Sequence, residues 1–211
     1  MAGTGTPEEI SSAAELTELL GAPTKRVLTK ERSRLHARDV EWLAASPFCL
    51  VATCGADGTC DVSPKGDAPG FVRALDDSRL VIPERNGNKR LDGMTNLLSN
   101  PHIGLLFIVP GFDYTLRISG RAWITRDPVL LDRMSAQGVA PRLAIGVEVQ
   151  QAFFHCVKAF RRSRLWAHGE WLGADALPSY ACTVFNQIRP QNATLEDWER
   201  SIAESDTRLY V

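Results

Sequence analysis

Residues 48 to 149 contain a series of short apolar runs separated by turn residues, and this pattern limits the possible folds more than any other feature of the chain. The first run, Phe48–Cys54, is followed by the hairpin signal Ala56-Asp57-Gly58 and by a returning segment at Thr59–Ser63. Further runs lie at residues 70–75, 79–83, 102–109, 114–125 and 143–149. Short segments at this spacing are typical of an antiparallel barrel or sandwich. The pattern predicts six or seven mostly antiparallel strands.

Helical patterns are expected around and between these strands. They are recognised by apolar residues at three- and four-residue spacing and by capping and stop residues. The expected helices lie at Pro7–Leu20, Asp39–Ala45, Lys89–Ser99, Asp127–Met134 and Ala152–Arg162. A further helix is expected to open at the capping box Thr194–Asp197. The sequence therefore predicts a mainly β protein of the α+β class, with a helical N-terminal extension (residues 1–37), a β-rich domain (38–190) and a helical C-terminal tail (191–211).

Charge and hydropathy exclude several classes of protein. The formal net charge of −1 gives no electrostatic reason to expect nucleic-acid binding. The first twenty residues carry Glu8, Glu9, Glu15 and Glu18 and have no basic start and no apolar run, so we expect no secretory signal. No apolar stretch is long enough to span a membrane. We expect no membrane association.

The cysteines indicate a reducing compartment. The chain has five of them, Cys49, Cys54, Cys60, Cys156 and Cys182, and they are odd in number and lack CxxC spacing. We interpret them as free thiols and expect a cytoplasmic location. No Cys/His cluster has the spacing of a metal site, so no metal is expected.

The segment from Ile82 to Leu91 is the most informative candidate for ligand binding. A strand is expected to end at Pro83 and a helix to begin near Asn88. A helix N-terminus presents unpaired amide groups and a partial positive charge, both of which suit a phosphate. The candidate donors are Arg85, Asn86, Asn88, Lys89 and Arg90. The alternative is a solvated basic turn, which charge alone favours, and the P-loop pattern is absent.

Two other segments could contact a ligand. Ser63 and Lys65 are expected where a strand meets the Pro- and Gly-rich loop that ends at Gly70. Residues 158 to 166 combine four cations with Trp166, and Ser163 and Arg164 lie among them. An ordinary surface loop and a solvated helix face are the respective alternatives. Motifs for serine hydrolases (GxSxG) and zinc proteases (HExxH) are absent, so neither of these hydrolytic activities is expected. No side chain is named as catalytic.

In their order and spacing these segments resemble the FMN-binding split barrels related to pyridoxamine 5′-phosphate oxidase, and most of all the short bacterial proteins described only as oxidase-related. The resemblance spans about residues 30 to 190. The residues that carry it are Asp61–Asp67, Gly70–Asp77, Ile82–Asp92, Asn96–Pro101, Gly104–Phe107, Arg117–Ala122, Ala152–Lys158 and Ser163–Trp166. The last twenty residues show no such likeness.

The resemblance implies a six-stranded antiparallel split β-barrel over residues 38–190 and a homodimer with FMN at the subunit interface. By position, the turn Arg85–Arg90 would hold the flavin phosphate, with Lys89 and Arg90 as the strongest candidates. Ser63 and Lys65 would lie along the flavin ring. Ser163, Arg164 and Trp166 would close the site, and the partner subunit is one possible source of these three.

The function that the resemblance implies is an FMN-dependent oxidoreductase acting on a small molecule, with NAD(P)H among the candidate substrates. The oxidase proper has an Arg-x-His pattern near its C-terminus that binds the vitamin substrate. Here Leu165–Gly169 is followed by no such pattern, so we do not expect pyridoxamine phosphate to be the substrate. The alternatives are a non-enzymatic flavin or haem carrier, a reductase that uses the deazaflavin F420, and an interaction protein with an empty barrel.

Overall fold

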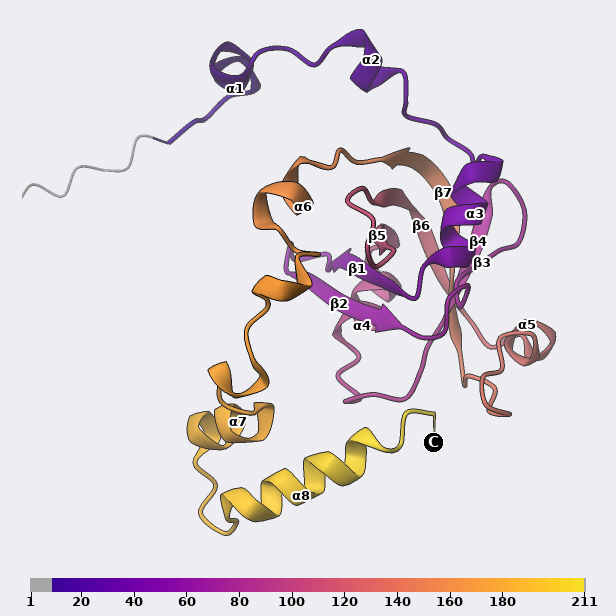
Figure 1. Cartoon of the computed structure of the whole chain (residues 1–211). Coiled ribbons are helices and arrows are strands. Elements are labelled where there is room, and N and C mark those ends of the chain that lie inside the picture. The colour runs from indigo at the N-terminus through magenta and orange to yellow at the C-terminus, as the bar shows by residue number, and fades with distance from the viewer. Residues whose placement is uncertain (1–8, 211) are drawn as a thin grey trace, which may run out of the picture.

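The computed structural model describes residues 9–210 and contains one antiparallel sheet of seven strands in the order β2-β1-β5-β6-β7-β4-β3 (Figure 1). The strands are β1 (Phe48–Cys54), β2 (Cys60–Gly66), β3 (Arg73–Ala74), β4 (Arg79–Pro83), β5 (His102–Ile108), β6 (Leu116–Thr125) and β7 (Ala144–Phe154). The mainly β, antiparallel class is confirmed. The six strands that the resemblance implies are one too few, because the two-residue strand β3 pairs with β4 as a seventh; seven is within the six or seven that the apolar runs predict. The two edge strands, β2 and β3, do not pair with each other, so the sheet is not closed.

Side-chain alternation along the central strands places the core inside the curve of the sheet. In β1 the buried residues Cys49, Val51 and Thr53 alternate with more exposed ones, as expected for a strand with one face in the core. Strand β4 is instead buried on both faces. Leu80 belongs to the main core, whereas Val81 packs with the second, smaller cluster beneath the helix that follows β6.

A β-bulge bends the two longest strands. The pairing of β6 with β7 shifts register between Ser119 and Gly120. A Cβ atom on Gly120 would lie 2.0 Å from the carbonyl oxygen of Glu148, so no residue with a side chain fits there without moving the backbone. The bulge therefore depends on glycine at this position, and it supplies the curvature that folds the sheet around the core.

Eight α-helices lie in the described part of the chain. They are α1 (Ala13–Leu20), α2 (Lys25–Leu28), α3 (Ala37–Ala45), α4 (Asp92–Ser99), α5 (Pro128–Asp132), α6 (Lys158–Ser163), α7 (Tyr180–Ile188) and α8 (Leu195–Asp206), with 3-10 turns at His168–Glu170 and Ala174–Ala176. The capping box expected at Thr194 is confirmed at the start of α8. The first helix begins after its cap Ser12 rather than at Pro7, which lies outside the described residues.

Two expected helices differ in ways that affect the candidate site. The helix expected from Lys89 begins only at Asp92, and Lys89 itself has a positive φ of 59°. The helix expected over Ala152–Arg162 is wrong in its first half, because residues 152–154 continue β7 and pair with β6. The apolar residues there have helical spacing, but strand pairing with β6 determines the conformation.

An ion pair with a buried carboxylate attaches the N-terminal segment to the sheet. The backbone of Arg32 pairs with that of Ala152, and its guanidinium donates to both carboxylate oxygens of Asp39 at 2.7 Å. Asp39 is fully buried, and it also accepts a hydrogen bond from the amide of His36, which caps α3. Because a buried carboxylate without partners is costly, this contact fixes where α3 enters the fold.

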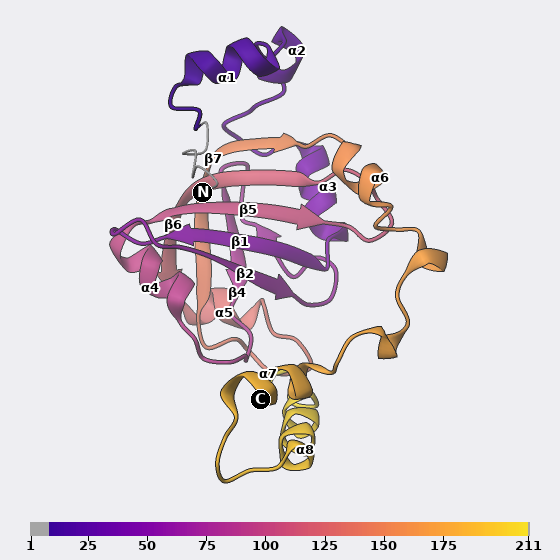
Figure 2. The same ribbon diagram turned by 90° about the vertical axis from the view of Figure 1, so that its left-hand side faces the viewer.

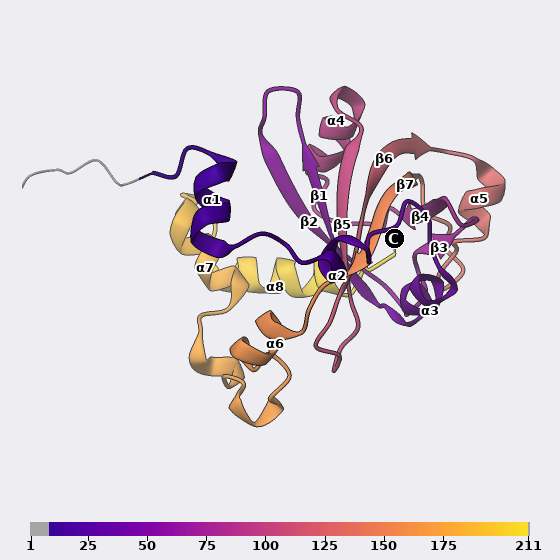
Figure 3. The ribbon, with the colours of Figure 1, turned by 90° about the horizontal axis from the view of Figure 1, so that it is seen from above.

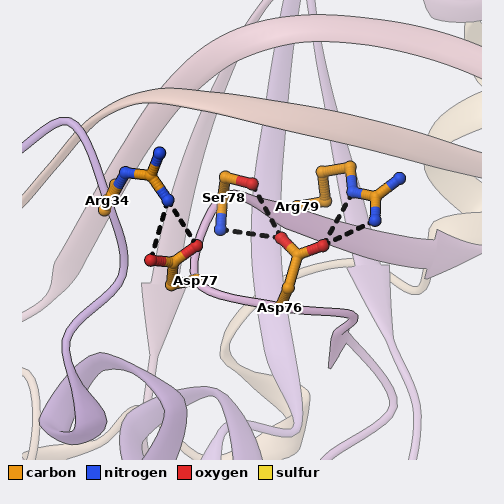
Figure 4. Close-up of polar contacts among 5 residues, drawn as sticks. All are labelled: Arg34, Asp76, Asp77, Ser78 and Arg79. Atoms are coloured by element: carbon orange, nitrogen blue, oxygen red, sulfur yellow. Dashed lines mark hydrogen bonds and ion pairs between the residues drawn. The ribbon is translucent and has the colours of Figure 1, made fainter.

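The turn between β3 and β4 is held by a second, exposed set of charges (Figure 4). Asp76 accepts hydrogen bonds from the Arg79 guanidinium and from the hydroxyl and amide of Ser78, and these contacts lower the pKa of the Asp76 carboxyl. Arg34 donates to both oxygens of Asp77 at 2.8 Å. The N-terminal segment is thus tied to both β7 and the β3–β4 turn.

The C-terminal helices form an arm that stands off the sheet (Figures 1 and 2), and in the view from above α8 passes underneath the strands (Figure 3). Helices α7 and α8 pack on each other, and the rings of Phe185 and Trp198 meet edge to face with centroids 6.1 Å apart. After α8 the chain returns to the barrel, where Tyr210 contacts Asp67. Among residues 9–210, no helix is both long and apolar enough to cross a membrane.

Replacing Asp39 by asparagine should lower the free energy of unfolding by roughly 2 kcal/mol, because the guanidinium of Arg32 loses its charged acceptor in a buried setting. Arg34→Ala is the matched control, since its ion pair with Asp77 is exposed and should contribute little. Urea denaturation of both variants gives the comparison. Equal losses in the two variants would show that burial of the Arg32–Asp39 pair is unimportant.

Candidate functional site

One face of β2 carries a row of three half-buried polar side chains, Asp61, Ser63 and Lys65, which we call the inner row of β2. The sequence places Ser63 and Lys65 at a strand end, but β2 continues to Gly66, so both are strand residues. The row faces α4 and the loop before it. Asp61 accepts a hydrogen bond of 2.7 Å from Asn96 in α4, and a Cβ on Gly93 would lie 3.9 Å from the Ser63 hydroxyl.

Two ion pairs join the end of β2 to the loop that follows β4, residues 84–91. Lys65 pairs with Glu84, and both side chains are largely buried. Arg85 pairs with Asp67, whose side chain is 3% exposed, with 2.5 Å between Nε and Oδ2. Arg85 also donates to the carbonyl oxygen of Met134 at 2.8 Å. Because β2 and β4 are not neighbours in the sheet, these contacts bridge the gap where the sheet is open.

Asp67 is the centre of this bridge. Burial alone would raise the pKa of its carboxyl, but hydrogen bonds from the Tyr210 hydroxyl and the Ala68 amide, together with Arg85, hold the pKa below its usual value. The same contact raises the pKa of Tyr210, because the carboxylate favours the protonated phenol. Asp67 is therefore an anion that fixes Arg85 and the end of the chain in one place.

The C-terminal segment covers the base of the loop. The guanidinium carbon of Arg85 lies 5.5 Å from the ring centre of Tyr210, and the side-chain amide of Asn86 donates to the Arg208 carbonyl at 3.4 Å. Sequence reasoning missed Tyr210, and no local signal could have found it, since 143 residues separate it from Asp67. Glu84 and Asp67 were visible inside the segments that we selected, but their role as partners of Lys65 and Arg85 was not.

The outer end of the loop carries the accessible positive charge. Lys89 is exposed and forms no ion pair with any of residues 9–210. Arg90 is also exposed and pairs with Asp92 at 2.7 Å, which raises the pKa of the arginine. The side-chain oxygen of Asn88 accepts the amide of Arg90 at 3.0 Å. We call residues 88–90 the cationic turn.

The cationic turn precedes α4 rather than opening it, which corrects the expected helix start near Asn88. The first residue of α4 is Asp92, and the residue before the helix, Leu91, makes no side-chain cap. A carboxylate in the first turn satisfies part of the helix dipole. An anion at this place would be bound mainly by the side chains of Lys89 and Arg90, and it would compete with Asp92 for Arg90.

The third segment selected from the sequence, residues 158–166, lies away from the loop 84–91 in the fold. The Ser163 hydroxyl donates to Phe160, Arg164 pairs with Glu170, and Trp166 stacks on Phe160 and donates to the carbonyl of Phe112 at 3.0 Å. Figure 2 shows α6 at the end of the sheet opposite α4. One chain therefore brings Lys65 to the loop 84–91 and Ser63 to the start of α4, but it does not bring Ser163, Arg164 and Trp166 there.

The donor set of the cationic turn fits a phosphate monoester. Two exposed cations, an amide side chain and the unobstructed Gly87, where an added Cβ would meet nothing within 4 Å, leave room for an anion with several oxygens. Within residues 9–210, no group of three or more His, Cys, Asp or Glu side chains is placed to hold a metal ion.

One protein-family model matches most of the sheet. The family model described as pyridoxamine 5′-phosphate oxidase matches residues 35–156, which is more than half of the chain. This interval runs from just before α3 to just past β7. It includes the inner row of β2 and the loop 84–91, and it excludes Ser163, Arg164 and Trp166. No curated protein sequence matches the chain significantly.

Three solved structures illustrate the range of similar folds. A candidate pyridoxamine 5′-phosphate oxidase from Lactobacillus delbrueckii is 21% identical over 58% of this chain and 95% of its own, with a TM-score of 0.44. An FMN-binding protein from Syntrophomonas wolfei is 10% identical over 68% and 93%, with a TM-score of 0.44. HutZ, a haem storage protein from Vibrio cholerae, is 13% identical over 58% and 94%, with a TM-score of 0.40.

The contribution of the Asp67–Arg85 ion pair to the free energy of unfolding should depend on pH. A carboxyl whose pKa is lowered by folding stabilises the folded state above its unfolded pKa, about 3.9, and this contribution is lost as pH falls through the folded value. Asp67→Asn should cost about 1–3 kcal/mol of unfolding free energy at pH 7 and less at pH 3. Urea unfolding at both pH values measures the difference. A cost that is the same at pH 3 and pH 7 would contradict an ionised Asp67 at this position.

Proposed function

Because the chain belongs to the pyridoxamine 5′-phosphate oxidase family, we propose that it binds FMN and acts as an FMN-dependent oxidoreductase on a small molecule. The observation that carries the proposal is the position of the cationic turn at the end of a loop anchored on the inner row of β2. A flavin nucleotide has a phosphate at one end and a flat polar ring at the other. The turn offers cations for the first, and the inner row offers donors for the second.

Different residues of the loop have different roles in this proposal. Lys89 and Arg90 bind the phosphate, and Asn88 adds a side-chain donor. Arg85 is engaged by Asp67, Met134 and Tyr210, so we assign it a positioning role in which it holds the loop against the end of β2. Asn86 continues this anchoring through the Arg208 carbonyl.

The inner row of β2 would face the flavin ring. FMN supplies hydride or electron transfer when it is bound, and the protein supplies orientation and electrostatics. The Ser63 hydroxyl can donate to or accept from a polar edge of the ring. Lys65 would place a positive charge beside that edge, and its partner Glu84 fixes the ammonium in position and reduces the net charge.

The outer face of the sheet supports a homodimer as part of the same proposal. Leu50, Ala52, Val62 and Leu106 share the face of β1, β2 and β5 that points away from the core, and Val62 is 62% exposed. A second copy of the chain would cover these side chains. The partner would then be the source of the Ser163, Arg164 and Trp166 group, which one chain keeps away from the loop.

A carrier that binds flavin or haem without turnover and a reductase that uses F420 are the competing functions. Oxidation of NAD(P)H in the presence of FMN and an artificial electron acceptor supports an enzyme. Tight binding of FMN without any turnover would leave only the binding part of the proposal.

A charged side chain introduced on the apolar outer face of the sheet should disrupt the proposed dimer. Sedimentation of the wild type at low micromolar concentration should give about twice the chain mass of 23.2 kDa. Val62→Asp should shift the protein towards the single-chain mass and reduce FMN binding, since a buried unpaired carboxylate is costly at an interface. Val129→Asp, on the exposed side of α5, is the matched control and should leave both unchanged. A stable FMN-loaded monomer would rule out a site built from two subunits.

The cationic turn should distinguish FMN from riboflavin, which lacks the phosphate. Lys89→Ala or Arg90→Ala should weaken FMN binding by roughly ten- to a hundredfold, at about 1.5–3 kcal/mol for each charge-assisted contact. The phosphate carries nearly two negative charges at pH 7. Riboflavin binding should change little, because the inner row of β2 is intact. Fluorescence-quenching titrations of both ligands at one salt concentration measure this.

Arg126→Ala is the control for the loss of a positive charge at an exposed position. It should bind both ligands like the wild type. If Lys89→Ala and Arg90→Ala also bind FMN like the wild type, the phosphate is held elsewhere. Equal loss of FMN and riboflavin would mean that the turn supports the fold and does not recognise the phosphate.

A further inference from the structure

The tip of the β1–β2 hairpin places two cysteines directly opposite each other. Cys54 is the last residue of β1 and Cys60 the first of β2, and the two are cross-strand partners in the sheet. All five cysteines of the chain are free in the structure. The pair is not recognisable from CxxC spacing, because the five residues between the two cysteines form the hairpin turn.

The hydrogen bonds of the turn show which kind of cross-strand position the pair occupies. The amide of Gly55 donates to the Thr59 carbonyl at 2.8 Å, so Gly55 and Thr59 are a hydrogen-bonded pair. Pairs alternate along an antiparallel ladder, and Cys54 with Cys60 is therefore a non-hydrogen-bonded pair. Pro64, which has no N–H group, occupies the same type of position opposite Leu50 and agrees with this assignment.

That position suits a disulfide. Cα atoms of a non-hydrogen-bonded pair are about 4.5 Å apart, and their side chains lie closer together than in the alternate pairs. Disulfides span Cα separations of about 4.4–6.8 Å. Both cysteines project from the outer face of the sheet at the hairpin tip, where they line a shallow groove with Val62 and His102, so a second copy that covers this face must leave the tip uncovered for exchange to occur. The two thiols can therefore be joined without moving either strand.

The environment of the two thiols assigns them different roles. Cys60 is exposed and Cys54 is half-buried. A hydrogen bond with the Cys60 thiol, with smaller contributions from burial and from the charge of Asp57, raises the pKa of Cys54. Cys60 is thus the thiol that an external reagent reaches first, and Cys54 is the neighbour that can react next. Cys49 is fully buried, and burial raises its pKa to about 12, which leaves it inert.

We propose that Cys54 and Cys60 form a reversible disulfide across the β1–β2 hairpin by exchange with an oxidised thiol such as glutathione disulfide. The Cys60 thiolate attacks one sulfur of glutathione disulfide, forming a mixed disulfide and releasing one glutathione. Cys54, as its thiolate, then attacks the Cys60 sulfur and releases the second glutathione. Two protein thiols lose two electrons and two protons, and one glutathione disulfide becomes two glutathione molecules.

The position of the bridge connects it to the rest of the structure. The next residue pair along the hairpin is Thr53 with Asp61, and both accept hydrogen bonds from the side-chain amide of Asn96 in α4, at 3.2 and 2.7 Å. A covalent link at the hairpin tip would restrain the strands on which α4 rests. The modification site thus lies one residue pair away from the inner row of β2.

To test this, the wild-type protein is incubated with glutathione disulfide and the exchange is quenched with acid. The protein is then unfolded, its remaining thiols are alkylated, and the mass of the intact chain is measured by mass spectrometry. The five thiols of the reduced chain should fall to three, with no glutathione attached, and dithiothreitol should restore all five. Asp57 lies between the two cysteines, so a protease that cleaves before aspartate separates them into two peptides. These should remain joined until reduction.

Two variants test whether the disulfide forms between Cys54 and Cys60 in particular. In Cys54→Ser the mixed disulfide at Cys60 has no second thiol to resolve it, so this variant should keep one glutathione. Cys156→Ser, which removes an exposed cysteine outside the hairpin, should lose two thiols as the wild type does. Retained glutathione on the wild type, five remaining thiols, or a link between two chains through Cys60 would each overturn the proposal.

Discussion

The bridge between the end of β2 and the loop after β4 is the contact on which the candidate site depends. These strands are not neighbours in the sheet, and no ladder hydrogen bonds join them. Two largely buried ion pairs, Lys65 with Glu84 and Arg85 with Asp67, cross the gap instead. Once the sheet has curled, partly through the bulge at Gly120, these pairs place the loop 84–91 beside the inner row of β2.

The same bridge divides the positive charges of the loop into two classes. A cation that is buried and paired contributes mainly to geometry, because its charge is already compensated. Arg85 is of this class, and Asp67 and Tyr210 hold it in place. Lys89 and Arg90 lie at the exposed end, where a charge can attract an incoming anion. A loop anchored at one end and charged at the other would bind an anion without having to be ordered first.

Local patterns in the sequence predicted the parts of this arrangement that depend on local chemistry. The strand class, the hairpin at Ala56–Gly58, the capping box at Thr194 and the two segments that meet at the site all follow from residue type and spacing. The family match over residues 35–156 agrees with the resemblance drawn from those segments. The start of α4 and the first half of the helix expected from Ala152 were wrong, because strand pairing and a left-handed residue at Lys89 overrode helical spacing.

What the sequence could not provide are the contacts between distant residues. The partner of Asp67 at Tyr210, the pairing of Cys54 with Cys60 at a non-hydrogen-bonded position, and the distance of Ser163, Arg164 and Trp166 from the loop all depend on the folded topology. Spacing along the chain carries no information about which charges become buried and paired. For this reason Arg85 and Lys89 look alike in the sequence and differ in the structure.

The absorption spectrum and ligand stoichiometry of the purified protein after equilibration with FMN test the central claim most directly. Our account predicts a bound flavin spectrum with one FMN per chain, and weaker binding of riboflavin under the same conditions because it offers no phosphate to Lys89 and Arg90. A protein that takes up haem or F420 but no FMN, or that binds riboflavin as tightly as FMN, would contradict it.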